Sequence, residues 1–200
     1  MRQILVVILL LGFSCAKGQL ATSPWQLELG VGSYGASLAV PRFNPFHLRC
    51  ELGATYQWNQ HPHSQWVQGF MLGYFRHRFV QRGVQAYTEF GWRWQWDGGV
   101  SLTPLLVGGG YVLSSPDMAS LEWNPATERY EQLNAPIRHN WLISIGSTMA
   151  YQIPKKLISF PISLYLSYRL HVQGIFIQRT VPIIVYSPLT LGIRTPLSRE

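Results

Sequence analysis

The chain has 200 residues, enough for one domain, and only 12% of them are charged, about half of the roughly 25% usual in a soluble protein. Lysine occurs only at Lys17, Lys155 and Lys156, although soluble β-proteins use lysine to keep their surfaces wet and their edge strands unpaired. The net charge of +7 comes mainly from scattered arginines. There is no basic run and no basic helix interleaved with aromatic residues, which argues against nucleic-acid binding.

The first 18 residues have the pattern of an export signal. Arg2 supplies a positive charge, an unbroken apolar run covers residues 4–11, and small residues precede a predicted cut before Gln19. The run is shorter than the about 20 residues that a membrane-spanning helix needs. Cleavage would remove Arg2 and Lys17, lower the net charge from +7 to +5, and leave residues 19–200 as a single domain. Lipoprotein processing at Cys15 is the alternative.

Six segments alternate apolar and polar residues, which places the two kinds on opposite faces of a β-strand. They are 25–34, 47–58, 84–96, 141–153, 158–173 and 187–197. In segment 84–96 the apolar face ends in Trp92, Trp94 and Trp96, whereas the other face carries Glu89 and Arg93. These two faces are typical of a strand with lipid on one side and a polar interior on the other.

Segment 65–79 is extended but apolar on both faces, and segment 100–113 is a further predicted strand. The pattern assigns the inward residues of neither segment. Short turns are predicted at 60–63, 81–83, 97–99 and 154–156, and Asp97–Gly98 is a hairpin signal because both residues tolerate positive φ. Longer loops are predicted at 36–46, 114–140 and 174–186. Three of the short turns fall at one end, which also holds both chain ends. This pattern predicts an all-β, eight-stranded, antiparallel, up-and-down transmembrane β-barrel.

The segments GYF, LTPLLVGGGYVL and LTLGI, within a strand pattern that runs from Trp25 to Leu197, resemble the small eight-stranded outer-membrane β-barrels of Gram-negative bacteria, the size class of OmpA and OmpX. The resemblance implies a bacterial outer-membrane location, contact with the lipid bilayer and lipopolysaccharide, insertion by the barrel assembly machinery, and no cofactor. One feature departs from that pattern. Such barrels usually end on an aromatic residue, whereas this sequence ends on Glu200.

The polar faces of the assigned strands would line a lumen that eight strands leave just wide enough for side chains to fill. Its ionisable residues are predicted to form a polar network, because an unpaired buried charge is costly. They are Glu28, Arg49, Glu51, Glu89, Arg93, Arg169, His171 and Arg194. Outward aromatic residues, among them Trp25, Trp58, Trp141 and Tyr151, are predicted at the lipid–water interfaces. A filled, charge-paired lumen argues against a wide diffusion pore.

The favoured role is therefore structural or surface-binding rather than catalytic. Region 114–140 is the best candidate for contact with an external ligand, because it carries Trp123 and Tyr130 among four acidic residues. Exposed aromatic residues on loops often mark binding surfaces.

Two alternatives stay open. A lipid hydrolase or acyltransferase needs a serine, a histidine and an acid in contact, and Ser144, Ser163, Ser167, His171 and Glu89 are inward residues of these types. Ser167 and His171 would be about 13 Å apart along one strand, so only Ser144 could pair with His171, if the strand register allows it. A soluble, lipocalin-like barrel would instead turn its apolar face inward around a ligand, but the scarce lysine and the tryptophans argue against it.

Two smaller features have structural interpretations. His61 and His63 could share a metal ion, but no carboxylate or cysteine lies nearby in the sequence, so a solvated turn is favoured. Cys50 lies on an apolar face, which predicts a small buried or lipid-facing hydrophobe. It is alone in the cleaved chain and cannot form an internal disulfide.

Overall fold

The computed structural model describes residues 23–35, 46–59, 61–77, 81–117, 120–125, 128–133, 137–154, 160–175 and 183–197. The strands in these ranges are β1 (Trp25–Gly35), β2 (Leu48–Gln57), β3 (Ser64–His77), β4 (Gln81–Gln95), β5 (Val100–Pro116), β6 (Ser120–Asn124), β7 (Arg129–Leu133), β8 (Arg138–Gln152), β9 (Ser163–Ile175) and β10 (Ile184–Pro196). The predicted export signal, residues 1–18, lies outside the described residues. Within the described ranges no helix has the length and hydropathy needed to cross a membrane.

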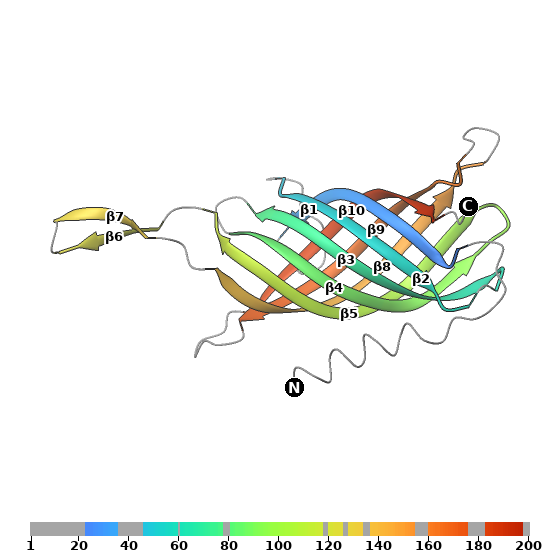
Figure 1. Cartoon of the computed structure of the whole chain (residues 1–200), viewed down its shortest axis with the longest axis horizontal. Coiled ribbons are helices and arrows are strands. Elements are labelled where there is room, and N and C mark those ends of the chain that lie inside the picture. The colour runs from blue at the N-terminus through green and yellow to red at the C-terminus, as the bar shows by residue number, and fades with distance from the viewer. Residues whose placement is uncertain are drawn as a thin grey trace.

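Eight strands form a closed antiparallel barrel (Figure 1). Around the ring their order is β1, β2, β3, β4, β5, β8, β9 and β10. The ring closes where β10 pairs with β1, with Gly30 opposite Gly192. A closed ring has no edge strand with unpaired backbone N–H and C=O groups, which is what lipid requires of a spanning sheet. The predicted fold class, an eight-stranded antiparallel up-and-down barrel, is confirmed.

The strands β6 and β7 form a separate two-stranded hairpin that projects beyond one end of the barrel (Figure 1). We call this the hairpin end, and we call the opposite end, where β1 begins and β10 ends, the terminal end. The connections between β2 and β3, between β4 and β5, and between β8 and β9 lie at the terminal end. The connection between β4 and β5 is short as predicted, but the connection between β8 and β9 covers residues 153–162 and is longer than the turn predicted at 154–156.

Strand β4 shows how the sequence pattern maps onto the barrel. Every second side chain from Gln81 to Arg93 is buried, and the side chains between them are exposed. The exposed set ends in Trp92 and Trp94, whereas the buried set includes Glu89. The polar face therefore lines the interior and the apolar face forms the outer wall, the reverse of a soluble protein. The lipocalin-like alternative needs the opposite arrangement and does not fit.

The structure assigns the inward residues of β3 and β5, the two strands for which the sequence pattern did not. In β3 the odd-numbered residues from Gln65 to Phe75 are buried. In β5 the pairing with both neighbours shifts around Pro104, and this irregularity lets Thr103 and Leu106 both face inward, three residues apart. The alternation of β5 changes phase at this point, which is why its sequence shows no simple period of two.

Four predicted boundaries are wrong, and in three of them paired strands continue beyond the alternating segments. The predicted turn 81–83 begins β4, where Gly83 pairs with Phe75 and Ser114. The predicted irregular region 114–140 contains the end of β5, the β6–β7 hairpin and the start of β8, and the predicted loop 174–186 contains the end of β9 and the start of β10. In contrast, β9 begins at Ser163 rather than at residue 158. Pro161, just before it, has no backbone N–H for a strand pair.

The hairpin predicted at Asp97–Gly98 forms, but its special backbone conformation falls one residue later than the prediction. Gly99 has a φ of 78°, in the region that favours glycine. The Gly99 N–H donates to the Trp96 carbonyl at 3.0 Å, and the Trp96 N–H donates to the Val100 carbonyl at 2.9 Å. These bonds hold the tight reversal between β4 and β5.

Candidate functional site

The lumen is filled by side chains of a polar network. The inward residues named from the sequence are all buried, and they are Glu28, Arg49, Glu51, Glu89, Arg93, Arg169, His171 and Arg194. They come from β1, β2, β4, β9 and β10. Their charges can meet only after these strands have closed into a ring. The buried glutamates and arginines number three and four, so the described lumen has one positive charge in excess.

The middle of the lumen is crossed by a chain of ion pairs. Arg169 Nε donates to the two carboxylate oxygens of Glu89 at 3.0 and 2.9 Å. Arg169 Nη1 also lies 3.4 Å from Glu51 Oε1, while Arg49 Nη2 donates to Glu51 Oε2 at 2.7 Å. Because these residues belong to β2, β4 and β9, the chain connects different sides of the barrel. Charge-assisted hydrogen bonds of this kind are the strong ones in proteins. The side chains that form them cross the lumen, so it is not a wide diffusion pore.

Buried tyrosines complete this network, although the sequence analysis did not name them as site residues. The Tyr87 hydroxyl accepts from Arg49 Nη2 at 2.7 Å and donates to Glu51 at 3.2 Å. The Tyr165 hydroxyl donates to Glu51 at 3.2 Å. Tyr87 and Tyr165 both lie on the polar faces of alternating strands, so their parity was a signal that could have identified them.

The hairpin end of the lumen is closed by aromatic rings. Tyr34 stacks between Phe75 and Tyr186, with ring centroids 4.4 and 4.5 Å apart. The Tyr34 hydroxyl accepts from Gln173 Nε2 at 2.5 Å, and Gln81 Nε2 donates to the Tyr186 hydroxyl at 2.6 Å. This stack forms a plug of buried rings whose polar edges are hydrogen-bonded, as buried tyrosines usually require.

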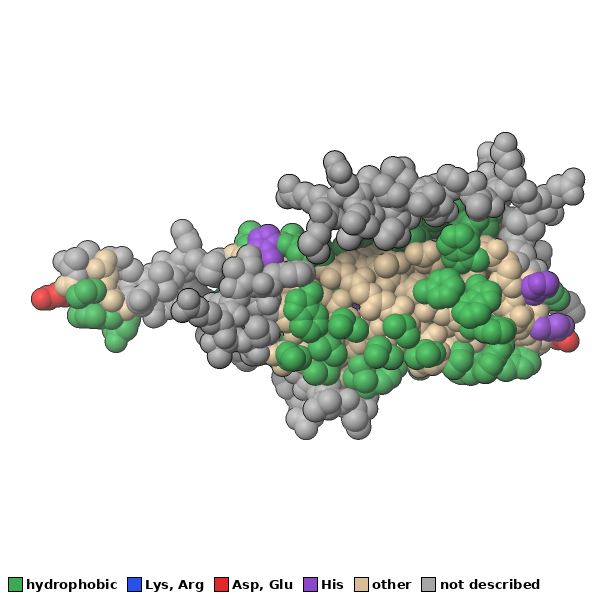
Figure 2. All heavy atoms as spheres, turned by 90° about the horizontal axis from the view of Figure 1, so that it is seen from below, with side chains coloured by type: hydrophobic (Ala, Val, Ile, Leu, Met, Phe, Trp, Pro, Cys, Tyr) green, Lys and Arg blue, Asp and Glu red, His purple; other side chains and the backbone are tan. Residues whose placement is uncertain are grey.

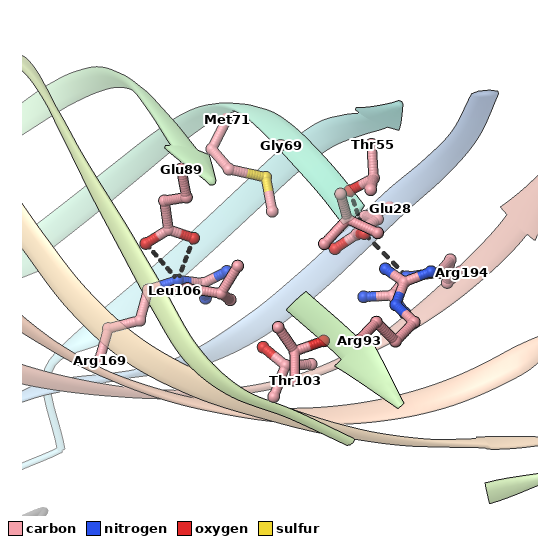
Figure 3. Close-up of a pocket in the computed structure, with 12 residues that line it drawn as sticks. Glu28, Thr55, Gly69, Met71, Glu89, Arg93, Thr103, Leu106, Arg169 and Arg194 are labelled. Atoms are coloured by element: carbon pink, nitrogen blue, oxygen red, sulfur yellow. Dashed lines mark hydrogen bonds and ion pairs between the residues drawn. The ribbon is translucent and has the colours of Figure 1, made fainter. Parts of the chain in front are cut away.

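Nearer the terminal end, a small cavity lies within the lumen (Figure 3). At one end of the cavity, Glu28 accepts from Thr55 Oγ1 at 2.5 Å and from Arg194 Nε at 2.8 Å. Arg93 lies beside Arg194 in Figure 3 and donates to Gln26 at 2.9 Å. The pair of Glu89 and Arg169 borders the other end.

The arrangement of Ser144, His171 and Glu89 does not form a catalytic triad. Ser144 and His171 are direct partners across β8 and β9, as the lipid-hydrolase alternative required. The Ser144 hydroxyl, however, donates to Glu89, and no hydrogen bond among the described residues joins Ser144 to His171. His171 Nδ1 instead lies 3.4 Å from Arg49 Nη1 and 3.5 Å from the Tyr34 hydroxyl. A base beside a guanidinium, with no exposed surface, is poorly placed to accept a proton from a serine.

The other two serines of that alternative are also engaged or distant. The Ser167 hydroxyl accepts from Arg169. Ser163 begins β9 and pairs with Gln152 and Arg194, far along the strand from His171. The structure therefore brings the inward serines into the ion-pair network rather than to the histidine.

The projecting hairpin carries the two aromatic residues that were predicted to contact an external ligand. Trp123 and Tyr130 are direct partners across β6 and β7, and their rings meet edge to face at 5.2 Å. Both remain exposed, at 49% and 68%. An aromatic cross-strand pair stabilises a hairpin, which matters because an isolated two-stranded hairpin is only marginally stable. The role of the pair in binding stays a prediction.

The remaining candidates from the sequence are two histidines and one cysteine. His61 and His63 are exposed between β2 and β3, and no cluster of metal-ligating side chains occurs among the described residues. Cys50 is a free, exposed cysteine on the outer wall of β2. Its position agrees with the lipid-facing form of its prediction.

The outer wall of the barrel carries many exposed apolar side chains, and Figure 2 shows patches of them on one face. Aliphatic residues such as Leu52, Leu72 and Leu191 occupy the middle of their strands. Aromatic residues gather toward the terminal end, where the rings of Trp66 and Trp92 lie 4.7 Å apart. Further exposed aromatic side chains near this end include Trp58, Trp94, Trp96, Tyr151 and Phe160. An apolar band bordered by aromatic residues is the surface expected of a barrel that spans a bilayer.

No protein-family profile matches the sequence, and no curated protein matches it. Solved structures do resemble the chain in three dimensions. The crystal structure of Ail, the attachment invasion locus protein of Yersinia pestis, has a TM-score of 0.51 at 12% identity and covers 88% of this chain and 99% of Ail. Neisserial surface protein A has a TM-score of 0.49 at 12% identity, with 89% and 100% covered. The outer membrane enzyme PagL has a TM-score of 0.49 at 11% identity, with 86% and 99% covered.

The fold is that of a small outer-membrane β-barrel. The match to Ail extends over nearly the whole of both chains, and the closed ring with its apolar wall agrees with it. At 12% identity the likeness extends to the fold and not to the activity. The function of this barrel must therefore be argued from its own residues.

Proposed function

We propose that the protein is a bacterial outer-membrane anchor that presents the β6–β7 hairpin outside the cell to bind a partner. The observation that carries the proposal is the exposed pair of Trp123 and Tyr130 on a hairpin that stands beyond the rim of the barrel. The ion-paired lumen supports an anchoring role, because its described side chains leave no wide channel and Ser144, His171 and Glu89 form no catalytic triad. Residues 1–18 would direct export and be removed before Gln19.

The apolar outer wall supports a location within a lipid bilayer. The hairpin end would face lipopolysaccharide, and the barrel assembly machinery would insert the chain. Arg76 and Arg82 are direct partners across β3 and β4 and both are exposed at this end. Arg76 Nε also donates to Asp117 at 2.9 Å. Exposed arginines at the level of lipid headgroups attract the anionic phosphates found there.

The charge of the hairpin suggests the chemistry of its partner. Residues 120–133 contain three acidic residues and one arginine, a net charge of −2. Glu128 and Arg129 are both exposed at the turn. An aromatic pair within an acidic hairpin fits a partner surface that combines an apolar patch with basic side chains.

Location and orientation can be tested in intact cells. An Asn124→Cys variant, made in a Cys50→Ala background, should react with a membrane-impermeant maleimide added outside. When the same cells are fractionated, the protein should be found in the outer-membrane fraction. Its band on SDS gels should shift between unboiled and boiled samples. Labelling only after the cells are broken would refute the proposed orientation.

Binding can be tested with the folded protein in lipid nanodiscs, using arrays of immobilised extracellular proteins and glycans as probes. A bound probe should be lost with the double variant Trp123→Ala/Tyr130→Ala. It should be retained with Ile137→Ala, an exposed apolar residue that precedes β8 and lies outside the hairpin strands. Equal binding by the double variant and the wild type would contradict a binding role for the aromatic pair.

A further inference from the structure

The lumen cavity near the terminal end is lined by more positive than negative charge. Arg93, Arg169 and Arg194 border it together with two acids, Glu28 and Glu89. One positive charge is therefore in excess around the cavity, the same excess found for the buried charges as a whole. Arginine keeps its proton at neutral pH, so this positive charge is present in the folded barrel.

Arg93 is the residue whose charge is not paired. Arg169 and Arg194 each form an ion pair with a glutamate, but no such pair includes Arg93 among the described residues. Its side chain is buried, its only hydrogen bond among them goes to the neutral Gln26, and its Nε is a buried donor without a partner. A buried charge of this kind is costly unless something compensates it.

The acids that border the cavity are already occupied by other groups. Glu28 accepts from Thr55 and Arg194, and Glu89 accepts from Arg169 and Ser144. Arg194 lies close enough to Arg93 for their positive charges to repel each other. Glu28 also attracts Arg93, but its charge is already balanced by the ion pair with Arg194, so the positive charge in excess stays at Arg93.

The cavity offers both the space and the donors for a compensating group. The centre of a water-sized sphere can move through about 20 Å³ of it, more than the about 10–15 Å³ that one water molecule requires. The Thr148 hydroxyl lines the cavity and is buried without a hydrogen-bond partner. Gln65 Oε1 is another buried atom without a partner, and Gln65 pairs with Arg93 across β3 and β4, but it does not line the cavity.

We propose that this cavity is a binding site for a compact monovalent anion of the halide class, held by the guanidinium groups of Arg93 and Arg194 and by the Thr148 hydroxyl. A single negative charge balances the one positive charge in excess, and the small volume favours a spherical ion over a larger polyatomic anion. The anion also supplies an acceptor for Arg93 Nε and for Thr148. The cavity lies at the opposite end of the barrel from the hairpin, so this site and the surface-binding role can fail independently.

Thr148 and Thr190 provide a matched pair of variants. Both are buried inward threonines whose hydroxyls have no hydrogen-bond partner, but only Thr148 lines the cavity. Valine has nearly the shape of threonine without the donor. Thr148→Val should therefore weaken anion binding, whereas Thr190→Val should not change it.

The probe is chloride, measured by ³⁵Cl NMR line broadening with the purified, folded full barrel in detergent and chloride-free buffer. Wild type and Thr190→Val should broaden the line equally, and bromide should compete. Thr148→Val should weaken binding severalfold, and Arg93→Gln should weaken it at least tenfold, in protein that still shows the heat-dependent gel shift. Thr148→Val keeps the test decisive if Arg93→Gln does not fold.

Crystals grown with bromide give an independent readout of the position. Anomalous density within hydrogen-bond distance of Arg93 and Thr148 would support the site. The proposal would be overturned if bromide bound on the outer surface only, which would show an adventitious ion only, or if the cavity held a water molecule. It would also be overturned by a ³⁵Cl line broadening no larger than that of empty micelles. Equal effects of Thr148→Val and Thr190→Val would also overturn it.

Discussion

Arg169 and Glu89 meet across the lumen from strands 80 residues apart in the sequence, with Arg169 Nε 3.0 and 2.9 Å from the two carboxylate oxygens. Both side chains are almost completely buried. Glu89 lies on β4 and Arg169 on β9, and each finds its partner on the other strand. The ion pair therefore depends on the closed ring. The folded barrel and its interior charge balance are therefore coupled.

The first prediction concerns this ion pair. Glu89→Gln or Arg169→Met alone should lower the free energy of unfolding by about 3–5 kcal/mol, because each leaves a buried charge without its partner. The double variant should cost less than the sum of the two single ones. Urea unfolding in lipid vesicles, followed by tryptophan fluorescence, measures all three. Additive effects within about 0.5 kcal/mol would mean that the two residues are energetically independent.

The second prediction uses neighbouring residues that face opposite sides of β9. Leu166 is 44% exposed on the outer wall, whereas Ser167 has no exposed surface. In a Cys50→Ala background, Leu166→Cys should react with a membrane-soluble maleimide but not with a charged one. Ser167→Cys should react with neither while the barrel is folded. Reaction of Ser167→Cys alone would mean that the two faces are reversed.

The third prediction concerns three consecutive glycines in β5. A Cβ atom at Gly108 or Gly110 would lie 1.9 Å from the Thr88 carbonyl oxygen or 2.1 Å from that of Ala86, whereas at Gly109 the nearest atom is 3.2 Å away. Gly108→Ala and Gly110→Ala should therefore cost about 1–3 kcal/mol or more, as overpacking does. Gly109→Ala should cost less. The unfolding midpoints of the three variants give the order, and equal costs would contradict the close approach of β4.

The fourth prediction separates the hairpin from the barrel. Among the described residues, β6 and β7 pair only with each other. Replacing residues 118–136 with a short Gly-Ser linker should therefore change the free energy of unfolding by no more than about 0.5 kcal/mol. The variant should keep its heat-dependent gel shift and lose any partner bound through Trp123 and Tyr130. A large loss of barrel stability would show that the hairpin is part of the folding unit.

Much of the barrel could be predicted from residue alternation. In strands such as β4, the period of two assigns Glu89 and Arg93 to one face and Trp92 and Trp94 to the other, whatever the neighbouring strands are. This local rule found the inward charges and the outer apolar wall. It also predicted the fold class, because only a closed sheet can bury such polar faces away from lipid.

The tertiary structure decided what depends on contacts between distant strands. The irregularity near Pro104 sets the inward residues of β5, and the strand register places Ser144 opposite His171 while Glu89 takes the hydrogen bond of Ser144. Whether Arg93 has a carboxylate partner was equally invisible, because it depends on how β1, β4 and β10 come together. Alternation along one strand determines the face of each residue, but only closure of the ring determines which residues meet across it.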